Sequence, residues 1–362
     1  MGRLFPGILI ILLISGCNKT ESFLAWERTY GTGEARFIRV TSESGIIACG
    51  NSEDHPYLVR LDENKMVILD FTAEIPGVFT SAWFDTSGYI TGGSTNGKML
   101  LVRHSKTGNK LWEKIMDPGF KVDQTQLLHL VNGNFLAIGS ASPDTIYEYS
   151  SGLLFFSFDS TGQVLNEVKY TNGFFIASYE AALDNSGNIY LALTRKEKTS
   201  KPRATVAKFN NQYQRIWEVE LANNPDYGAA TLAIMHDGSG KVYASGRTEL
   251  PSENGLINNS FIASISDAGS LNWKKYPENS NSGTALLLNS GGEIVILNIY
   301  CFIVNVLDPG KGDDAGRIRM FDVCDPYNTD AIASDFDITV DNDFVLAGSL
   351  GGSFYLAVKT LQ

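Results

Sequence analysis

The sequence predicts an all-β fold, a seven-bladed β-propeller of four-stranded antiparallel blades whose ring is closed by the N-terminal strand pairing in the last blade. Three observations predict it: a short apolar strand recurs seven times, a second strand follows each copy, and the first and last strands of the chain complement each other. The composition agrees, because 43% hydrophobic residues and 35 glycines against 11 prolines suit many short strands joined by tight turns.

The first recurring element is a five-residue apolar strand. Each copy follows a polar turn rich in Gly, Asn, Asp or Ser, which are the residues that tight turns favour. Neighbouring copies start between 43 residues (46 to 89) and 54 residues (135 to 189) apart, close to the length of a propeller blade. The seven copies are IIACG (46–50), YITGG (89–93), FLAIG (135–139), IYLAL (189–193), VYASG (242–246), IVILN (294–298) and FVLAG (344–348).

A second strand and an outer strand follow each copy. Apolar residues alternate with smaller or polar ones in the second strand, as in YLVRLD (57–62) and LLVRHS (100–105), which is typical of a strand with two unlike faces. The outer strand then has a repeated position that we expect to pack between blades. In the first five copies this position holds Leu69, Trp112, Asn166, Trp217 and Trp273.

The innermost and closing strands complete the predicted blades. Segments such as RFIRVTS (36–42), TSAWFDT (80–86) and TQLLHLV (125–131) are expected to be innermost. The last copy ends three residues after FYLAVK (354–359), without an outer strand, and FLAWERTYG (23–31) has the form of that strand. Pairing of the two would remove open sheet edges that template aggregation.

The N-terminus has the form of a signal sequence. MGRLFPGILIILLISGC (1–17) has one arginine and an apolar stretch shorter than the roughly 20 residues that span a bilayer. LISGC resembles the bacterial lipobox, which implies acyl chains, palmitate among them, on Cys17; an ordinary signal peptide with a chance cysteine is the alternative. We therefore expect a lipoprotein signal peptide at 1–16, a tether at 17–22 and a single propeller domain at 23–362. Asn18 after the cysteine resembles the outer-membrane type, so the predicted location is the bacterial cell envelope, on either side of the outer membrane.

Charge and motifs exclude several functions. A net charge of −11 argues against a nucleic-acid partner, which needs clustered Lys and Arg. The four histidines and four cysteines have no metal-ligand spacing, so no catalytic residue, metal or cofactor is predicted. Cys301 and Cys324 either pair or remain free thiols. Paired carboxylates need only lie about 5 to 10 Å apart in space, so the sequence leaves an enzyme possible.

Two segments resemble known propellers. HSKTGNKLWEK (104–114) resembles a repeat element of quinoprotein-like propellers, a group with outer-membrane-assembly lipoproteins and quinone dehydrogenases. The segment 40–68 is more similar to repeats of uncharacterised Bacteroidetes-type surface lipoproteins. The resemblance covers nearly the whole mature chain and implies an architecture rather than a function, since one fold hosts many activities. No residues match the quinone cofactor site.

The connections between the first and second recurring strands differ most in length. The long ones are 140–153, 194–204 and 247–260, in the third, fourth and fifth copies, and variable loops on a rigid scaffold often carry function. They supply a mixed aromatic and basic set that suits an anionic sugar, a peptide carboxylate or a partner protein. These predicted ligand-binding residues are Tyr147, Tyr149, Arg195, Lys196, Arg203 and Arg247.

The leading functional hypothesis is a lipid-anchored envelope propeller that acts as a non-catalytic binding or scaffold module. It would be held at the membrane by Cys17 and would bind a protein or glycan partner through the variable-loop face. The alternative is an extracytoplasmic enzyme, either a carbohydrate-active hydrolase or lyase or a quinone-dependent oxidoreductase, with its site near the central channel. A third hypothesis is an envelope-assembly factor.

Overall fold

A computed structural model describes most of the chain after its N-terminal segment. The described residues are 22–141, 152–171, 175–197, 200–222, 228–252, 255–277, 282–298, 303–319 and 331–361. All regular elements among them are β-strands, and no described segment forms a helix that could cross a membrane. Cys17, Tyr147, Tyr149, Cys301 and Cys324 lie outside these residues.

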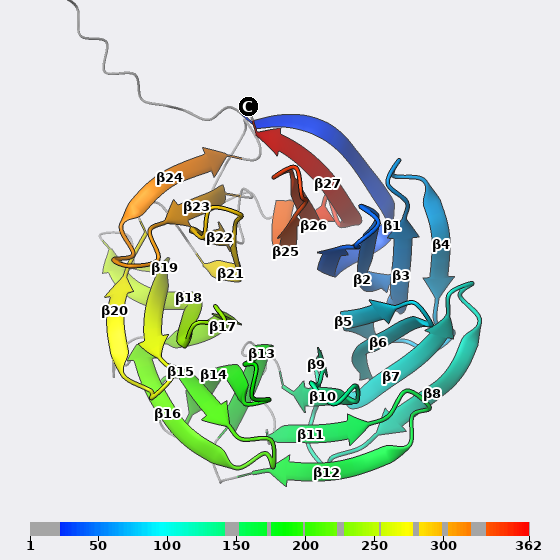
Figure 1. Ribbon diagram of the computed structural model, residues 1–362, viewed down its shortest axis with the longest axis horizontal. Helices are drawn as coiled ribbons and strands as arrows, with labels where there is room; N and C mark the ends of the chain where they lie inside the picture. Colours follow the sequence, from blue (N-terminus) through cyan, green and yellow to red (C-terminus); the bar gives the residue numbers. More distant parts are fainter. Residues whose placement is uncertain are drawn as a thin grey trace, which may run out of the picture.

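The strands form five four-stranded sheets and one of seven strands. The four-stranded sheets, in strand order, are β5 (Val78–Asp85), β6 (Gly88–Thr95), β7 (Lys98–Ser105) and β8 (Lys110–Met116); β9 (Gln124–His129), β10 (Phe135–Ser140), β11 (Leu153–Phe158) and β12 (Val164–Tyr170); β13 (Phe175–Leu183), β14 (Ile189–Lys196), β15 (Arg203–Phe209) and β16 (Arg215–Ala222); β17 (Ala229–His236), β18 (Lys241–Ser252), β19 (Gly255–Ser266) and β20 (Leu271–Lys275); and β21 (Gly283–Leu288), β22 (Ile294–Asn298), β23 (Ile303–Leu307) and β24 (Asp314–Arg319). The seven-stranded sheet has the order β25 (Ala331–Ile338), β26 (Phe344–Leu350), β27 (Ser353–Leu361), β1 (Ser22–Val40), β2 (Ile46–Ser52), β3 (His55–Leu61) and β4 (Val67–Thr72). All neighbouring strands are antiparallel, and the sheets stand around a common axis (Figure 1).

The long strand β1 joins the two ends of the chain. Its first part pairs with β27, with Trp26 opposite Val358, so the N-terminal segment lies beside the last strand, as expected from the sequence. Its second part continues inward and pairs with β2. Gly33 lies between the two parts with φ +148°, and a Cβ there would be 2.1 Å from the Asn51 carbonyl oxygen. Glycine is therefore required where the strand passes from one partner to the other.

The core lies between neighbouring sheets. Leu136, Ile138 and Phe155 of the β9–β12 sheet, for example, pack with Leu191 and Phe209 of the β13–β16 sheet. The second strand of each sheet is almost wholly buried, which explains why its recurring motif is apolar. The outermost strands alternate between exposed and half-buried residues and face solvent on one side.

Two outer-strand tryptophans tie their sheets to the next sheet. The Trp112 indole of β8 donates a hydrogen bond to the Ser160 carbonyl at 3.4 Å, and Trp217 of β16 donates to the Asp267 carbonyl at 3.0 Å. Both acceptors lie in the turn before the next outer strand. These contacts agree with the expectation that the repeated outer position packs between neighbouring sheets.

Candidate functional site

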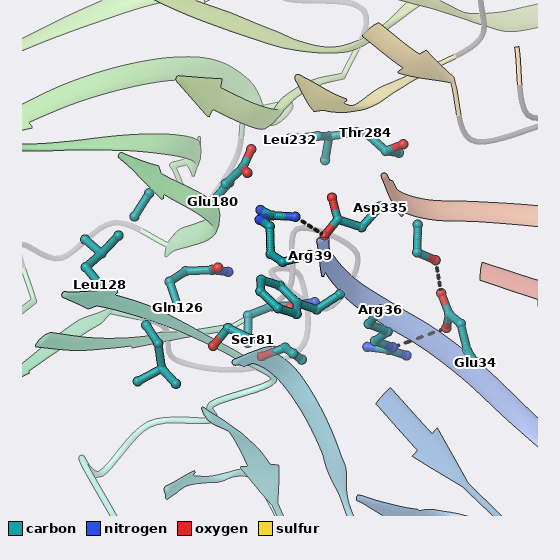
Figure 2. A pocket seen from close by; sticks show the side chains of 16 residues that line it. Glu34, Arg36, Arg39, Ser81, Gln126, Leu128, Glu180, Leu232, Thr284 and Asp335 are labelled. Carbon is teal, nitrogen blue, oxygen red and sulfur yellow. Dashed lines mark hydrogen bonds and ion pairs between the residues drawn. The ribbon is translucent and has the colours of Figure 1, made fainter. Parts of the chain in front are cut away.

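A cavity of about 100 Å³ lies on the axis, where the innermost strands converge (Figure 2). Each of the strands β1, β5, β9, β13, β17, β21 and β25 contributes to its wall. One lining residue from each, in that order, is Arg39, Ser81, Gln126, Glu180, Leu232, Thr284 and Asp335. The wall is therefore mainly polar and contains both signs of charge.

Two carboxylates enter the cavity from equivalent positions. Glu180 pairs with Ala192 and Asp335 with Ala347, and each follows a one-residue irregularity in its inner strand. Such a bulge re-aims the side chains that follow it. The corresponding position of the other inner strands holds Phe37, Ser81, Gln126, Ala233 and Ala285. The repeat architecture therefore does not require a charge here.

Asp335 is buried, and both oxygens of its carboxylate accept hydrogen bonds. Its Oδ2 accepts from the Ile38 amide at 3.0 Å and from Arg39 Nη1 at 2.7 Å, and its Oδ1 accepts from the Phe336 amide at 2.9 Å. Burial raises the pKa of Asp335 above its usual value, and the positive charge of Arg39 works in the opposite direction. Asp335 thus ties the last inner strand to the first and fixes the guanidinium of Arg39.

Glu180 makes the same link to the following sheet but with one oxygen. Its Oε2 accepts a hydrogen bond from the Ile234 amide at 2.9 Å, and Ile234 holds the position that Ile38 holds beside Asp335. Burial and the nearby charge of Asp335 raise the pKa of Glu180 to about 8, against the opposing effects of Arg39 and the Ile234 amide. Near neutral pH the carboxyl is therefore largely protonated and can donate a proton or a hydrogen bond.

Arg39 stands between the two carboxyl groups in Figure 2. Its Nη1 also donates to the Ile38 carbonyl at 2.5 Å, and the guanidinium lies 4.6 Å from the centre of the Phe37 ring. A second ion pair lines the same cavity, because Arg36 Nε donates to Glu34 at 3.2 Å and the Ser334 hydroxyl donates to Glu34 at 2.6 Å. The cavity can thus bind polar or charged groups through fixed donors beside one protonated acid.

The sequence-predicted residues that are described lie in the fourth and fifth repeats. Arg195 is the residue before Lys196, which ends β14, and Arg195 is directly opposite Arg203 on β15. Arg195 Nη1 is 2.7 Å from Glu218 and Arg203 Nη1 is 3.3 Å from Glu220, so neighbouring carboxylates balance both charges.

Arg247 lies on β18, in a different sheet. It is opposite Ala230 on one side and Ser260 on the other. The segment 247–260 is an extension of the β18–β19 hairpin, which pairs as far as Ser252 opposite Gly255. Most of this connection is therefore strand.

Sequence reasoning missed the axial carboxylates. Glu180 lies in FIASYEAAL and Asp335 in AIASDFDI, each a charge inside an otherwise apolar or small-residue segment. A charged residue inside such a strand could have marked both positions as candidate site residues. The bulges that turn both side chains to the axis leave no such mark in the sequence.

A second acidic group lies between the β13–β16 and β17–β20 sheets. Asp184, His236 and Asp267 place ligand-type atoms within 4.8 Å of one another. The Lys208 ammonium is 2.5 Å from Asp267 and 3.7 Å from Asp184, and the Tyr190 hydroxyl donates to both carboxylates. The lysine already supplies the positive charge, so this group is a structural ion cluster.

Comparison with known proteins identifies the architecture. No family model matches the sequence, and no curated protein matches it. The structure is similar to the WD40 domain of Pan2 from Neurospora crassa (TM-score 0.66, 10% identity, 94% of this chain and 96% of that one). It is also similar to the WD40 β-propeller domain of Doa1 (TM-score 0.61, 12% identity, 94% and 97%) and to virginiamycin B lyase from Staphylococcus aureus (TM-score 0.63, 10% identity, 94% and 100%). The chain is a β-propeller. At this identity the likeness shows the fold alone.

Proposed function

We propose that the chain is a lipid-anchored, seven-bladed propeller of the bacterial outer membrane. It acts there as a non-catalytic binding module for a protein or glycan partner. The count of seven is supported by the seven inner strands around the cavity and by hydrophobic clusters between successive sheets. On this count β1 serves two blades, as the outer strand of the last and the inner strand of the first. The resemblance to Bacteroidetes-type surface lipoproteins belongs to the same proposal.

The membrane anchor rests on LISGC before Asn18. Cys17→Ser removes the thiol that would carry the acyl chains, so the full chain expressed in a Gram-negative host should move from the membrane fraction to the soluble fraction. Cys49→Ser is the matched control, because Cys49 is a buried thiol in β2 and should not affect partitioning. Retention of the Cys17→Ser chain in the membrane fraction would refute the anchor.

The axial cavity carries the binding proposal. Gln124 starts β9 opposite Ser140, and Phe175 starts β13 opposite Lys196, so the inner strands begin at the end of the ring where the long connections leave. The cavity wall extends along the inner strands, from Glu34 and Gln124 near that end to Arg39 and Leu128 near the other end. We infer that a ligand reaches the cavity and the variable connections together. Tyr147, Tyr149, Arg195, Lys196, Arg203 and Arg247 are the proposed surrounding contacts.

Calorimetric titration tests this proposal. Uronic-acid, amino-sugar and neutral oligosaccharides and C-terminal carboxylate peptides would be titrated into the mature chain, wild type against Arg39→Gln and Arg247→Ala. We expect one class to bind, at least tenfold more weakly in Arg39→Gln and less weakened in Arg247→Ala. Lys110→Gln, on the outer strand β8, is the control. Affinities that are equal in wild type and Arg39→Gln would count against the cavity.

A second candidate function is favoured by Glu180. A carboxyl group with a pKa near 8, beside a fixed guanidinium, meets the requirement for a general acid in a hydrolase or lyase. Reducing-end and unsaturated-product assays on the same oligosaccharides would detect either reaction. Glu180→Gln should abolish turnover but keep binding, whereas turnover that survives in this variant would exclude Glu180 as the acid.

A further inference from the structure

The junction between the β9–β12 and β13–β16 sheets differs from its neighbours at the outer edge. In three other junctions a tryptophan lies against a glycine in the next sheet's outer turn. A Cβ would be 2.9 Å from Trp112 at Gly162, 3.0 Å from Trp217 at Gly269 and 2.5 Å from Trp273 at Gly312. The indole and the bare glycine backbone are therefore a matched pair.

Both members of this pair change at the β12 position. Asn166 replaces the tryptophan. Tyr213, with φ +64°, holds the turn position of Gly108, Gly162 and Gly269, a position that Lys65 holds in the first repeat. The turn itself is conserved in geometry, because the Tyr213 amide bonds to the Asn210 carbonyl as the Gly269 amide bonds to that of Ser266. The Tyr213 ring is buried and stacks on Phe155, with ring centres 5.2 Å apart and planes 11° apart.

A groove of about 400 Å³ remains where the indole would lie. We call it the Asn166 groove and define its wall by Val131, Asn134, Leu165, Asn166, Asn211 and Tyr213, with neighbouring Asn, Gln, Ser and apolar residues. This volume falls within the roughly 300 to 1,000 Å³ of small-molecule sites. The groove lies at the strand-turn end, away from the end where the inner strands begin.

The wall chemistry indicates what the groove binds. None of its described lining residues carries a charge, although the chain as a whole has a net charge of −11. The side-chain amides of Asn134, Asn166, Asn211 and Gln212 make no hydrogen bond to any other described residue, and each offers both donors and an acceptor. Val131 and Leu165 add apolar surface that is 72% and 49% exposed.

We propose that the Asn166 groove binds a neutral sugar, one or two pyranose units of a glycan. A sugar ring presents hydroxyl groups that match side-chain amides and a C–H face that matches Val131 and Leu165. A charged ligand would lose hydration with no opposite charge in the wall to compensate it. This inference is independent of the axial cavity, because the two sites share no residue.

Restoring the repeat pattern tests the groove. Asn166→Trp combined with Tyr213→Gly recreates the tryptophan–glycine pair and fills the space. Cellobiose, maltose, lactose and N,N′-diacetylchitobiose would be titrated into wild type and variant by ligand-observed NMR, with glucuronate and glucosamine as charged comparisons. We expect at least one neutral disaccharide to bind wild type, the charged sugars to bind at least tenfold more weakly, and the double variant to lose binding.

A second pair of variants is less demanding on folding. Val131→Asp introduces a charge at the rim of the groove. Val340→Asp is the matched change, because Val340 holds the equivalent turn position in the last repeat and its side chain is 86% exposed. Only Val131→Asp should reduce sugar binding by tenfold or more. Equal effects of both variants, or no neutral sugar bound by wild type, would overturn the proposal. Sedimentation gives one further outcome that would overturn the proposal: a dimer that forms with rising concentration in wild type and not in the double variant. A second copy of the chain would then occupy the groove.

Discussion

The β13–β16 sheet meets its two neighbours in different ways. Toward the β17–β20 sheet, Trp217 closes the outer edge against Gly269, and we call this the Trp217 junction. Toward the β9–β12 sheet, Asn166 and Tyr213 stand in the equivalent places, at what we call the Asn166 junction. Both junctions have a continuous apolar core farther in. The core therefore suffices to join two blades, and the outer edge is free to vary.

The Trp217 junction also has a polar layer behind the indole. The Lys208 ammonium lies 5.0 Å from the centre of the Tyr190 ring and bridges toward Asp184 and Asp267. The His236 ring stacks on Tyr190, with centres 5.2 Å apart. In contrast, the described residues that line the Asn166 groove are all uncharged. At the Trp217 junction the polar groups therefore bind one another, whereas at the Asn166 junction side-chain amides remain available to a ligand.

Alanine substitution of the outer-strand residue should give the largest difference in stability between the two junctions. Trp217→Ala removes a half-buried indole and its hydrogen bond to Asp267, so we expect a loss of about 3 kcal/mol in the free energy of unfolding. Asn166→Ala, the matched change at the other junction, should cost less than about 0.5 kcal/mol, as is usual for surface positions. Urea titration monitored by circular dichroism measures both. Similar losses would mean that the groove is a structural element.

Substitution of Tyr213 should reduce stability less than Trp217→Ala, and the glycine variant should be more stable than the alanine variant. Tyr213→Gly loses the ring stacked on Phe155 but relieves a positive φ, so we expect a net loss of about 2 kcal/mol. Tyr213→Ala loses the same ring and keeps the strained backbone, so it should be less stable than Tyr213→Gly by about 1 kcal/mol. Thermal unfolding of the two variants measures the difference. A more stable Tyr213→Ala would show that the turn is not strained by its side chain.

The outer positions were predictable from the sequence because they repeat. Alignment of the motifs placed Trp112, Trp217 and Trp273 together, with Leu69 and Asn166 at the same position of two other repeats. The pairing of the N-terminal strand with the last strand was predicted from the same alignment, and the structure places Trp26 opposite Val358. What Asn166 faces could not be predicted, since Tyr213 lies in the next repeat, at a turn position where Gly108, Gly162 and Gly269 stand in other repeats.

The axial site was harder to predict for a physical reason. Glu180 and Asp335 are 155 residues apart in number (335 minus 180) and meet only because the strands converge on one axis. Their orientation depends on bulges, which are properties of backbone pairing with a neighbouring strand. Neither residue belongs to a motif, and local pattern alone predicts only that an apolar strand contains a charge.

The last prediction depends on pH and concerns the inner end of the Trp217 junction, where Glu180 accepts a hydrogen bond from the Ile234 amide. Burial and Asp335 raise the pKa of Glu180 from 4.5 to about 8, so between these values the unfolded chain loses this proton while the folded chain retains it. The contribution of Glu180 to stability is therefore fully present below pH 4.5 and is lost as the pH rises to about 8. Glu180→Gln, which cannot ionise, should show a shallower decline of unfolding free energy over this window. Glu167→Gln on the outer strand β12 is the control and should keep the wild-type slope. Parallel profiles for wild type and Glu180→Gln would show that Glu180 is already ionised in the folded protein, and the acid role proposed for it would then fail.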